Sequence, residues 1–424
     1  MKPISEVVAC VVDHGLFPHI AQCLAEKCKK VFYTGPAEEV MRTFEKAAIG
    51  DGYPNMTRVE SLWQVDGLCD FFVFPDTGFR WEQNKLLRDG RAVFGHHGAD
   101  ILESNKREFL RVLDDLGMEV PPHTEITGMD ELMEFLEDKE DRYVKVSNWR
   151  GDWETFHWRN ADQDGDYLRG HKYNRSPARN LFTFWVFDPI DTPIEDGVDS
   201  HCIEGQWPKK VLHAMERKDR SLIGAMQNLS DVHESVRCVN EKFGPYLGAR
   251  FGYRGPFSTE VRPPYFIDPT CRFGSPPSQL QTVLIKNLPE VMYHGAYGAL
   301  IEPEFDDHIG AQVLITGDRE KEEWLTFPMD EELRPFIKSA FSCHINGHCQ
   351  IAPNPLENWA GWLVATGKSI REVVDTLKER KQSLPDGFEC DITSLADLLR
   401  ELEDAEAEGI QIANARIPEP SIVL

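Results

Sequence analysis

The segment YFIDPTCRFGSPP, residues 265–277, carries polar side chains at every second position. Asp268, Thr270 and Arg272 follow an apolar run, so in an extended strand all three would point to the same side. A carboxylate is a ligand for Mg²⁺, a hydroxyl offers a further oxygen contact, and the planar guanidinium of arginine matches phosphate oxygens. The pattern therefore predicts a site for a metal-bound phosphate on one face of this strand.

A neighbouring segment supplies a second carboxylate. FSTEVR, residues 257–262, is separated from the first segment by only two prolines, so the two are predicted to form a hairpin that brings Glu260 close to Asp268. Two carboxylates about 4 Å apart repel each other by about 4 kcal/mol at an effective dielectric constant of 20, and a divalent cation between them would convert this cost into binding. The alternative is an ion pair between Arg272 and one of these carboxylates on a solvated sheet face.

Two lysines favour the phosphate interpretation. Lys106 lies in the first turn of a helix predicted to start at Ser104, and helix N-termini favour phosphate. Lys145 lies in the middle of the predicted strand RYVKVS, between two apolar valines that fix the direction of its side chain. A lysine in a strand is more often an ordinary surface residue, but this one precedes a polar tract, residues 148–180, that is predicted to be a mobile loop or lid.

The elements that would hold these residues change character along the chain. Up to about residue 103, continuous apolar strands alternate with helices, which predicts a parallel sheet covered on both faces. Ligands of such sheets bind beyond the carboxyl ends of the strands, so Asp13 and Asp76 are candidates. From residue 181 the sequence is rich in predicted strands, and after about 300 come further strands, a hairpin at 341–351 and two helices, the first capped by Ser369.

Length and charge limit the classes of function. At about 150 residues per domain, 424 residues predict about three domains. The 46 basic and 71 acidic residues give a net charge of -25, which disfavours binding to nucleic acid and to anionic membranes, so an anionic ligand needs a local basic cluster or a metal. The N-terminal segment is predicted to be a strand and not a signal peptide, and no run approaches the about 18 apolar residues that a membrane span needs. Ten cysteines without framework spacing predict reduced thiols and a cytoplasmic location.

Three motif-like segments are weaker candidates. GWLVATGKS (361–369) has one residue too many for a phosphate-binding P-loop, which favours a plain loop before a helix. NADQDGDYLRGH (160–171) lacks the glutamate that ends a calcium loop, which favours a flexible turn. SCHINGHCQ (342–350) contains Asn-Gly, which predicts a hairpin with Cys343 and His348 on one face and His344 and Cys349 on the other, so the four side chains cannot converge and a zinc site is not expected.

Taken in order, the motifs resemble the ATP-grasp superfamily, and within it the phosphoribosylamine-glycine ligase-like proteins, phage-encoded relatives included. Four segments carry the resemblance: ESNKREFLRVLDDLGMEVPPH, YVKVSNWRGDWETF, DPIDTPIEDGVDSHCIEG and YFIDPTCRFGSPP. The resemblance implies a mixed α/β and α+β fold in four parts. These are a pre-ATP-grasp parallel α/β domain (1–103), an ATP-grasp lid subdomain (104–185), an ATP-grasp catalytic subdomain (186–300) and a small C-terminal α+β domain (301–424).

The resemblance also implies roles for single residues. ATP phosphates would be held by Lys106 and Lys145, the adenine would lie beside Asp188, and the ribose hydroxyls beside Glu195 or Asp199. Mg²⁺, for which Mn²⁺ could substitute, would be bound by Glu260, Asp268 and Thr270, whereas Lys218 and Arg272 would act on the transferred phosphoryl group. Loop position alone adds four candidates for the substrate side: Asp76, Arg80, Arg150 and Arg254.

Two positions depart from the family pattern. The glycine-rich lid is replaced by SNWRGDWET (147–155), and Thr270 stands where the family usually has a ligating Asn, so one metal site would be looser or completed by water. The predicted function is an ATP-dependent ligase that joins a small carboxylate to an amine or related nucleophile through an acyl phosphate. The alternatives are a catalytically weak nucleotide-binding regulatory or scaffold protein and an α/β hydrolase, although the sequence lacks the hydrolase nucleophile elbow. The identity of the substrates and the oligomeric state stay open.

Overall fold

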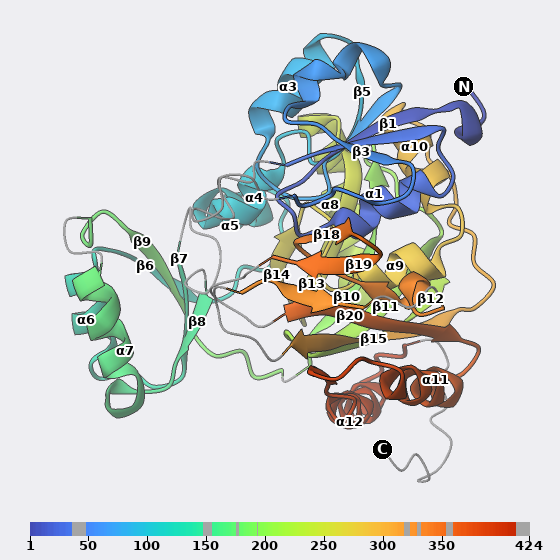
Figure 1. Cartoon of the computed structure of the whole chain (residues 1–424). Helices are drawn as coiled ribbons and strands as arrows, with labels where there is room; N and C mark the ends of the chain where they lie inside the picture. The colour runs from blue at the N-terminus through green and yellow to red at the C-terminus, as the bar shows by residue number, and fades with distance from the viewer. Residues whose placement is uncertain are drawn as a thin grey trace.

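The computed structural model describes residues 1–35, 48–146, 155–174, 178–192, 194–317, 323–328, 332–352 and 359–412. Its strands form four sheets, one parallel and three antiparallel, with helices packed around them (Figure 1). This arrangement confirms the predicted α/β and α+β fold class. No helix in these ranges has the length and apolar character needed to cross a membrane.

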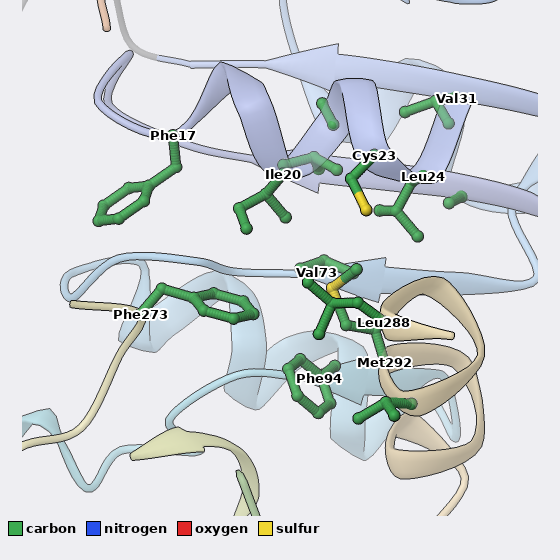
Figure 2. Close-up of a cluster of buried hydrophobic side chains, with 14 of the residues drawn as sticks. Phe17, Ile20, Cys23, Leu24, Val31, Val73, Phe94, Phe273, Leu288 and Met292 are labelled. Atoms are coloured by element: carbon green, nitrogen blue, oxygen red, sulfur yellow. The ribbon is translucent and has the colours of Figure 1, made fainter. Parts of the chain in front are cut away.

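The N-terminal sheet is parallel, as predicted, with the strand order β3-β2-β1-β4-β5. Its apolar strands are buried on both faces because alternate residues enter different cores: Val11 lies in one cluster and Val12 in the other. On one face, Ile20 and Leu24 of α1 approach Leu288 of α10 (Figure 2). The elements are β1 (Val8–Val12), α1 (Pro18–Ala25), β2 (Lys30–Thr34), β3 (Met56–Arg58), β4 (Phe71–Val73), α3 (Arg80–Arg88) and β5 (Ala92–Phe94).

A small sheet with the order β6-β9-β7-β8 and two helices projects to one side of the molecule (Figure 1, left). It corrects the prediction of a loop over 148–180, because the described part of that tract contains a strand and a helix. Its few apolar residues are enough: Phe156, Trp158 and Leu168 are all buried in the small core. The elements are β6 (His123–Thr127), α6 (Met129–Leu136), β7 (Arg142–Val146), β8 (Thr155–Trp158), α7 (Ala161–Asn174) and β9 (Thr183–Phe187).

Helix α7 also corrects the prediction for the calcium-like segment 160–171. It was predicted to be a flexible turn, but residues 161–171 are helical in α7. Asp164, one of the would-be calcium ligands, instead accepts a hydrogen bond from the backbone N–H of Arg159 (2.7 Å) and pairs with its guanidinium. The segment therefore starts a helix and does not form a cation loop.

The largest sheet has nine strands and continues across residue 300, because β12 pairs with β15. Residues 361–367, predicted to be a loop, belong to strand β20, where Trp362 and Leu363 are buried. The predicted domain boundaries stay predictions. The strands are β10 (Asp196–Ile203), β11 (Lys210–Arg217), β12 (Ser221–Asn228), β13 (Arg254–Arg262), β14 (Tyr265–Thr270), β15 (Ile309–Gly317), β17 (Ile337–Lys338), β20 (Trp359–Gly367) and β21 (Phe388–Cys390).

Two local predictions near the C-terminus are confirmed. The 341–351 hairpin forms from β18 (Ser342–Ile345) and β19 (His348–Ile351), and Asn346 and Gly347 both have positive φ, as the turn requires. Helix α11 (Ile370–Gln382) is capped by Ser369, whose hydroxyl accepts a hydrogen bond from the backbone N–H of Glu372. Strand β16 (Leu325–Phe327) completes the hairpin sheet, and α12 (Ser394–Ala407) packs against β11 and β12.

The helix predicted to start at Ser104 is two helices. α4 (Asp100–Ser104) ends at Asn105, and the Asn105 side chain then caps α5 (Lys106–Asp115) by accepting from the backbone N–H of Glu108. The other helices are α8 (Glu234–Phe251), α9 (Ser278–Leu284) and α10 (Leu288–Ala296), with short 3-10 turns at Ile4–Glu6, Leu62–Gln64, Asp66–Leu68, Leu229–Asp231 and Arg334–Phe336.

Candidate functional site

A cavity of about 960 Å³ lies between the small sheet, helix α5 and one end of the large sheet. This volume is at the upper end of the range usual for small-molecule sites, so the cavity has room for a nucleotide. Eleven of the predicted site residues line it: Asp76, Lys106, Lys145, Asp188, Glu195, Asp199, Lys218, Glu260, Asp268, Thr270 and Arg272.

The predicted hairpin is confirmed at the floor of the cavity. Strands β13 and β14 pair antiparallel, and the register places Glu260 directly opposite Asp268. The hydroxyl of Thr270 donates a hydrogen bond to Glu260 Oε1 at 3.2 Å. Cys271, between Thr270 and Arg272, is fully buried in the core, as the alternation of side chains predicts.

Two lysines from different elements converge on one carboxylate. Lys106 Nζ lies 2.9 Å from Asp268 Oδ1, and Lys145 Nζ lies 3.1 Å from Asp268 Oδ2. Burial tends to raise the pKa of Asp268, but the two ammonium groups outweigh it and hold this pKa well below its ordinary value. Asp268 is therefore ionised, and it occupies positions on both lysines that a phosphate group could take.

Glu260 responds in the opposite direction. Burial raises its pKa well above the ordinary value, and the neighbouring carboxylates, Asp268 first among them, raise it further. The negative charge of the carboxylate pair is therefore more stable on Asp268 than on Glu260. A cation placed between the two would favour ionisation of both.

The donor set fits a metal that completes its shell with other ligands. In the described ranges, no group of three or more His, Cys, Asp or Glu side chains has the arrangement of a metal site. Glu260 and Asp268 supply two carboxylates, and Thr270 adds a hydroxyl beside them. Mg²⁺ commonly takes one or two carboxylates and fills the remaining positions with water and substrate phosphate, so these residues suit Mg²⁺ bound together with a nucleotide.

Three of the predicted acidic residues line the part of the cavity near β9 and β10. Asp188, just after β9, pairs with Arg142 Nε at 3.1 Å, and Glu195 pairs with Arg262 Nε at 3.2 Å. Asp199, on β10, accepts a hydrogen bond from the hydroxyl of Ser258. Burial raises the pKa of Asp199 to about 7, although this hydrogen bond opposes the shift.

Asp199 should make stability depend on pH. Below its ordinary pKa of about 3.9, Asp199 is protonated in both the folded and the unfolded chain. Between about 3.9 and about 7, the folded chain keeps this proton whereas the unfolded chain releases it. The free energy of unfolding therefore decreases as pH rises through this range. Asp199→Asn cannot ionise and still offers an oxygen to Ser258. We expect its thermal unfolding midpoint to exceed that of the wild type clearly at about pH 8 and much less at about pH 5. An equal or reversed difference at the two pH values would contradict the raised pKa of this carboxyl group.

Two of the three arginines predicted for the substrate side do not line the cavity. Arg80 and Arg254 are not among the cavity-lining residues, because each is engaged elsewhere: Arg80 binds Asp100 (2.9 Å), and Arg254 binds Glu204 and the carbonyl oxygen of Ala296. Arg150 lies outside the described residues. Of the four substrate-side candidates, only Asp76 lines the cavity.

Among the cavity residues that were not predicted are Glu216 and Glu103. Glu216, on β11, faces the cavity, where burial raises its pKa to about 8 and the carboxylates of Asp199 and Asp219 add to the effect, although solvent still reaches its side chain. Its position two residues before Lys218 was no reliable signal, because β11 ends at Arg217 and Lys218 lies in the turn that follows. Glu103 gave no local signal, since its partner Arg272 is 169 residues away in the sequence.

Comparison with known proteins identifies the architecture. No family model and no curated protein sequence matches the chain. Among solved structures, phosphoribosylamine-glycine ligase from Thermotoga maritima superposes with a TM-score of 0.66 at 14% identity, covering 91% of this chain and 97% of that chain. L-amino acid ligase from Bacillus licheniformis gives 0.58 at 14% identity, with coverages of 92% and 99%.

A third similar structure contains ligands. The biotin carboxylase domain of 2-oxoglutarate carboxylase from Hydrogenobacter thermophilus, in complex with MgADP, ADP and bicarbonate, gives a TM-score of 0.61 at 10% identity and covers 98% of this chain and 97% of that chain. At identities of 10% to 14%, the similarity is one of fold. It extends over nearly the whole length of every chain compared, and the protein therefore shares the fold of these proteins, the ATP-grasp fold that the sequence predicts.

Proposed function

We propose that the protein is an ATP-dependent ligase that joins a small-molecule carboxylate to an amine or related nucleophile through an acyl phosphate, with ADP as the nucleotide product. The observation that carries the proposal is the convergence of Lys106 and Lys145 on Asp268, directly opposite Glu260, in a cavity of nucleotide size. The similar structures are ligases and a carboxylase domain, one of them bound to MgADP. Nothing in the described cavity favours a regulatory nucleotide-binding protein over an enzyme.

The roles of the residues follow from their positions. When ATP binds, Lys106 and Lys145 would exchange Asp268 for phosphate oxygens, and Asp268 would become a metal ligand together with Glu260 and Thr270. Mg²⁺ would neutralise charge on the phosphates, which an acidic cavity otherwise repels. Lys218 and Arg272 would stabilise the phosphoryl group during transfer to the carboxylate.

The remaining acidic residues would bind the nucleoside. Asp188 lies next to the strand that would pass the adenine, and Glu195 and Asp199 are the candidates for the ribose hydroxyls. Small-sheet closure over the cavity would exclude water, which would otherwise hydrolyse an acyl phosphate. We also propose a cytoplasmic location, because all ten cysteines are free thiols.

Product analysis tests the proposed reaction. The protein would be incubated with Mg-ATP and pools of small carboxylates and amines, alone and combined, and nucleotides and phosphate would be measured. We expect ADP and phosphate to form at a rate that depends on both pools. AMP and pyrophosphate would contradict the acyl phosphate, and saturable binding of Mg-ATP without turnover in any mixture would favour the regulatory alternative.

Metal binding should release a proton. Because the pKa of Glu260 is raised by burial and by the neighbouring carboxylates, Mg²⁺ placed between Glu260 and Asp268 should lower this pKa and release the proton that Glu260 holds. Titration calorimetry with magnesium and a non-hydrolysable ATP analogue, in two buffers of different ionisation enthalpy, should show net release near neutral pH. Glu260→Gln has no proton to lose there and should abolish the release; release that persists in this variant would contradict the assignment.

A further inference from the structure

Arg272 is held in place by carboxylates from two distant parts of the chain. Its Nε lies 2.9 Å from Glu103 Oε1 and 3.6 Å from Asp76 Oδ1, and its Nη1 donates to the carbonyl oxygen of Phe273 at 3.2 Å. The side chain of Arg272 is 19% exposed and lines the cavity. The three partners therefore set the orientation of the guanidinium group at the cavity.

Glu103 is the better placed of the two carboxylates. Its side chain is only 5% exposed, and its second oxygen, Oε2, accepts a hydrogen bond from the backbone N–H of Cys271 at 3.2 Å. One carboxylate therefore fixes both the backbone before Arg272 and the guanidinium itself. Glu103 lies in α4, immediately before α5, so it also connects the segment after β14 to the helix that starts with Lys106.

This arrangement matters for a group that must meet a transferring phosphoryl group. Charge-assisted hydrogen bonds to a buried carboxylate are short and directional, so they restrict the guanidinium far more than solvent would. Misplacing a reacting or stabilising group by about 1 Å can lower a rate by roughly 10²-fold. Because Glu103 engages Nε, it sets the plane in which the rest of the guanidinium meets the cavity.

We propose that Glu103 is a positioning residue that orients Arg272 for phosphoryl transfer. This inference rests on the proposed function, because it gives Arg272 a role in stabilising the transferred group. If the proposal is right, a mutation of Glu103 lowers the reaction rate only when Arg272 is present. If Glu103 merely stabilises the fold, the loss of rate does not depend on Arg272.

A double-mutant cycle separates these cases. Glu103→Gln keeps the size of the side chain and one acceptor but removes the charge, and Arg272→Met keeps most of the apolar stem. We expect E103Q to lower kcat for ADP formation by roughly 10²-fold with little change in the KM for ATP. In the R272M background, E103Q should have almost no further effect. Equal losses in both backgrounds, or no loss in either, would overturn the proposal.

Two further variants serve as controls for this cycle. Asp100→Asn removes a buried carboxylate from the same helix, where it pairs with Arg80 outside the cavity, so its effect should be independent of Arg272. Glu103→Asp keeps the charge and should give a smaller loss than E103Q, with the same dependence on Arg272. If E103Q does not fold, the cycle is completed with Glu103→Asp.

A binding measurement keeps this proposal distinct from the proposed function. The same cycle is measured as affinity for Mg-ADP with aluminium fluoride, which mimics a phosphoryl group in transfer, and for Mg-ADP alone. We expect E103Q to weaken the first complex at least about tenfold and the second hardly at all, and only when Arg272 is present. Absence of ADP formation by the wild type would sink the proposed function. Equal weakening of both complexes would sink the role of Glu103.

Discussion

Asp268→Asn should lower magnesium-dependent ATP turnover by roughly 10²- to 10³-fold, the loss typical of removing one preorganised electrostatic group from an active site. The variant loses the ionised carboxylate that faces Glu260, which is one of the two carboxylates among the three proposed metal ligands. The measurement is the steady-state rate of ADP formation over a range of Mg²⁺ concentrations. Turnover at the wild-type rate would reject the metal assignment.

The same substitution should cost some stability, because two ammonium groups lose their anionic partner. Breaking a fully buried ion pair costs about 3–5 kcal/mol. Solvent reaches Asp268 (25% exposed) and Lys145 (20% exposed), so we expect the smaller loss of about 1–2 kcal/mol in the free energy of unfolding.

A matched control is available on helix α7, which packs with the small sheet. Asp164 is a carboxylate paired with Arg159 outside the cavity, and Asp164→Asn makes the same chemical change there. It should lower the unfolding midpoint without the loss of turnover. Similar loss of turnover in both variants would mean that Asp268→Asn acts through the fold.

Lys106→Met should lower kcat/KM for ATP by roughly 10²- to 10³-fold. Lys106 is 6% exposed, its ammonium group lies 4.7 Å from the ring centroid of Phe109, and methionine can keep this apolar contact while removing the charge. The reason for the loss is electrostatic: the triphosphate would lose one of the two cations that converge at Asp268. Initial rates at varied ATP concentration give the value.

Lys338→Met is the matched control for this variant. Lys338 is also a buried lysine, with a pKa lowered by burial, but it lies on β17 and does not line the cavity. We expect Lys338→Met to keep the wild-type kcat/KM. A loss as large as that of Lys106→Met would show that removing any buried lysine disturbs the enzyme, and would contradict a specific role for Lys106.

The parts of the site that were predictable from sequence are those set by strand periodicity. In a strand, side chains alternate between two faces, so the common direction of Asp268 and Thr270 and the burial of Cys271 follow from local order alone. The short connection between β13 and β14 made the opposition of Glu260 and Asp268 predictable as well. The parallel N-terminal sheet followed from its continuous apolar strands for a related reason.

Contacts between distant segments were not predictable in this way. Lys106 and Lys145 reach Asp268 across 162 and 123 residues, and only the tertiary arrangement of α5, β7 and the hairpin brings them together. Sequence motifs indicated the two lysines as phosphate ligands but gave no sign that a carboxylate bridges them in the absence of nucleotide. The pairing of Glu103 with Arg272 was missed for the same reason.

Loop position was a poor guide. Arg80 and Arg254 were assigned to the substrate side, yet each is satisfied by a carboxylate outside the cavity lining, Asp100 and Glu204. The polar tract after β7 was predicted to be a loop because its apolar residues are few, but a thin layer of one sheet and two helices needs only a few buried side chains. In both cases tertiary partners decided the outcome.

The most direct test of the account is the path of oxygen during the reaction. Carboxylates labelled with ¹⁸O would be incubated with the protein, Mg-ATP and hydroxylamine as the nucleophile, and the released phosphate and nucleotide would be analysed by mass spectrometry. An acyl phosphate transfers one carboxylate oxygen to phosphate, so the account predicts ¹⁸O in inorganic phosphate together with ADP and a hydroxamate. Hydroxamate formed with ¹⁸O in AMP and none in phosphate would contradict it.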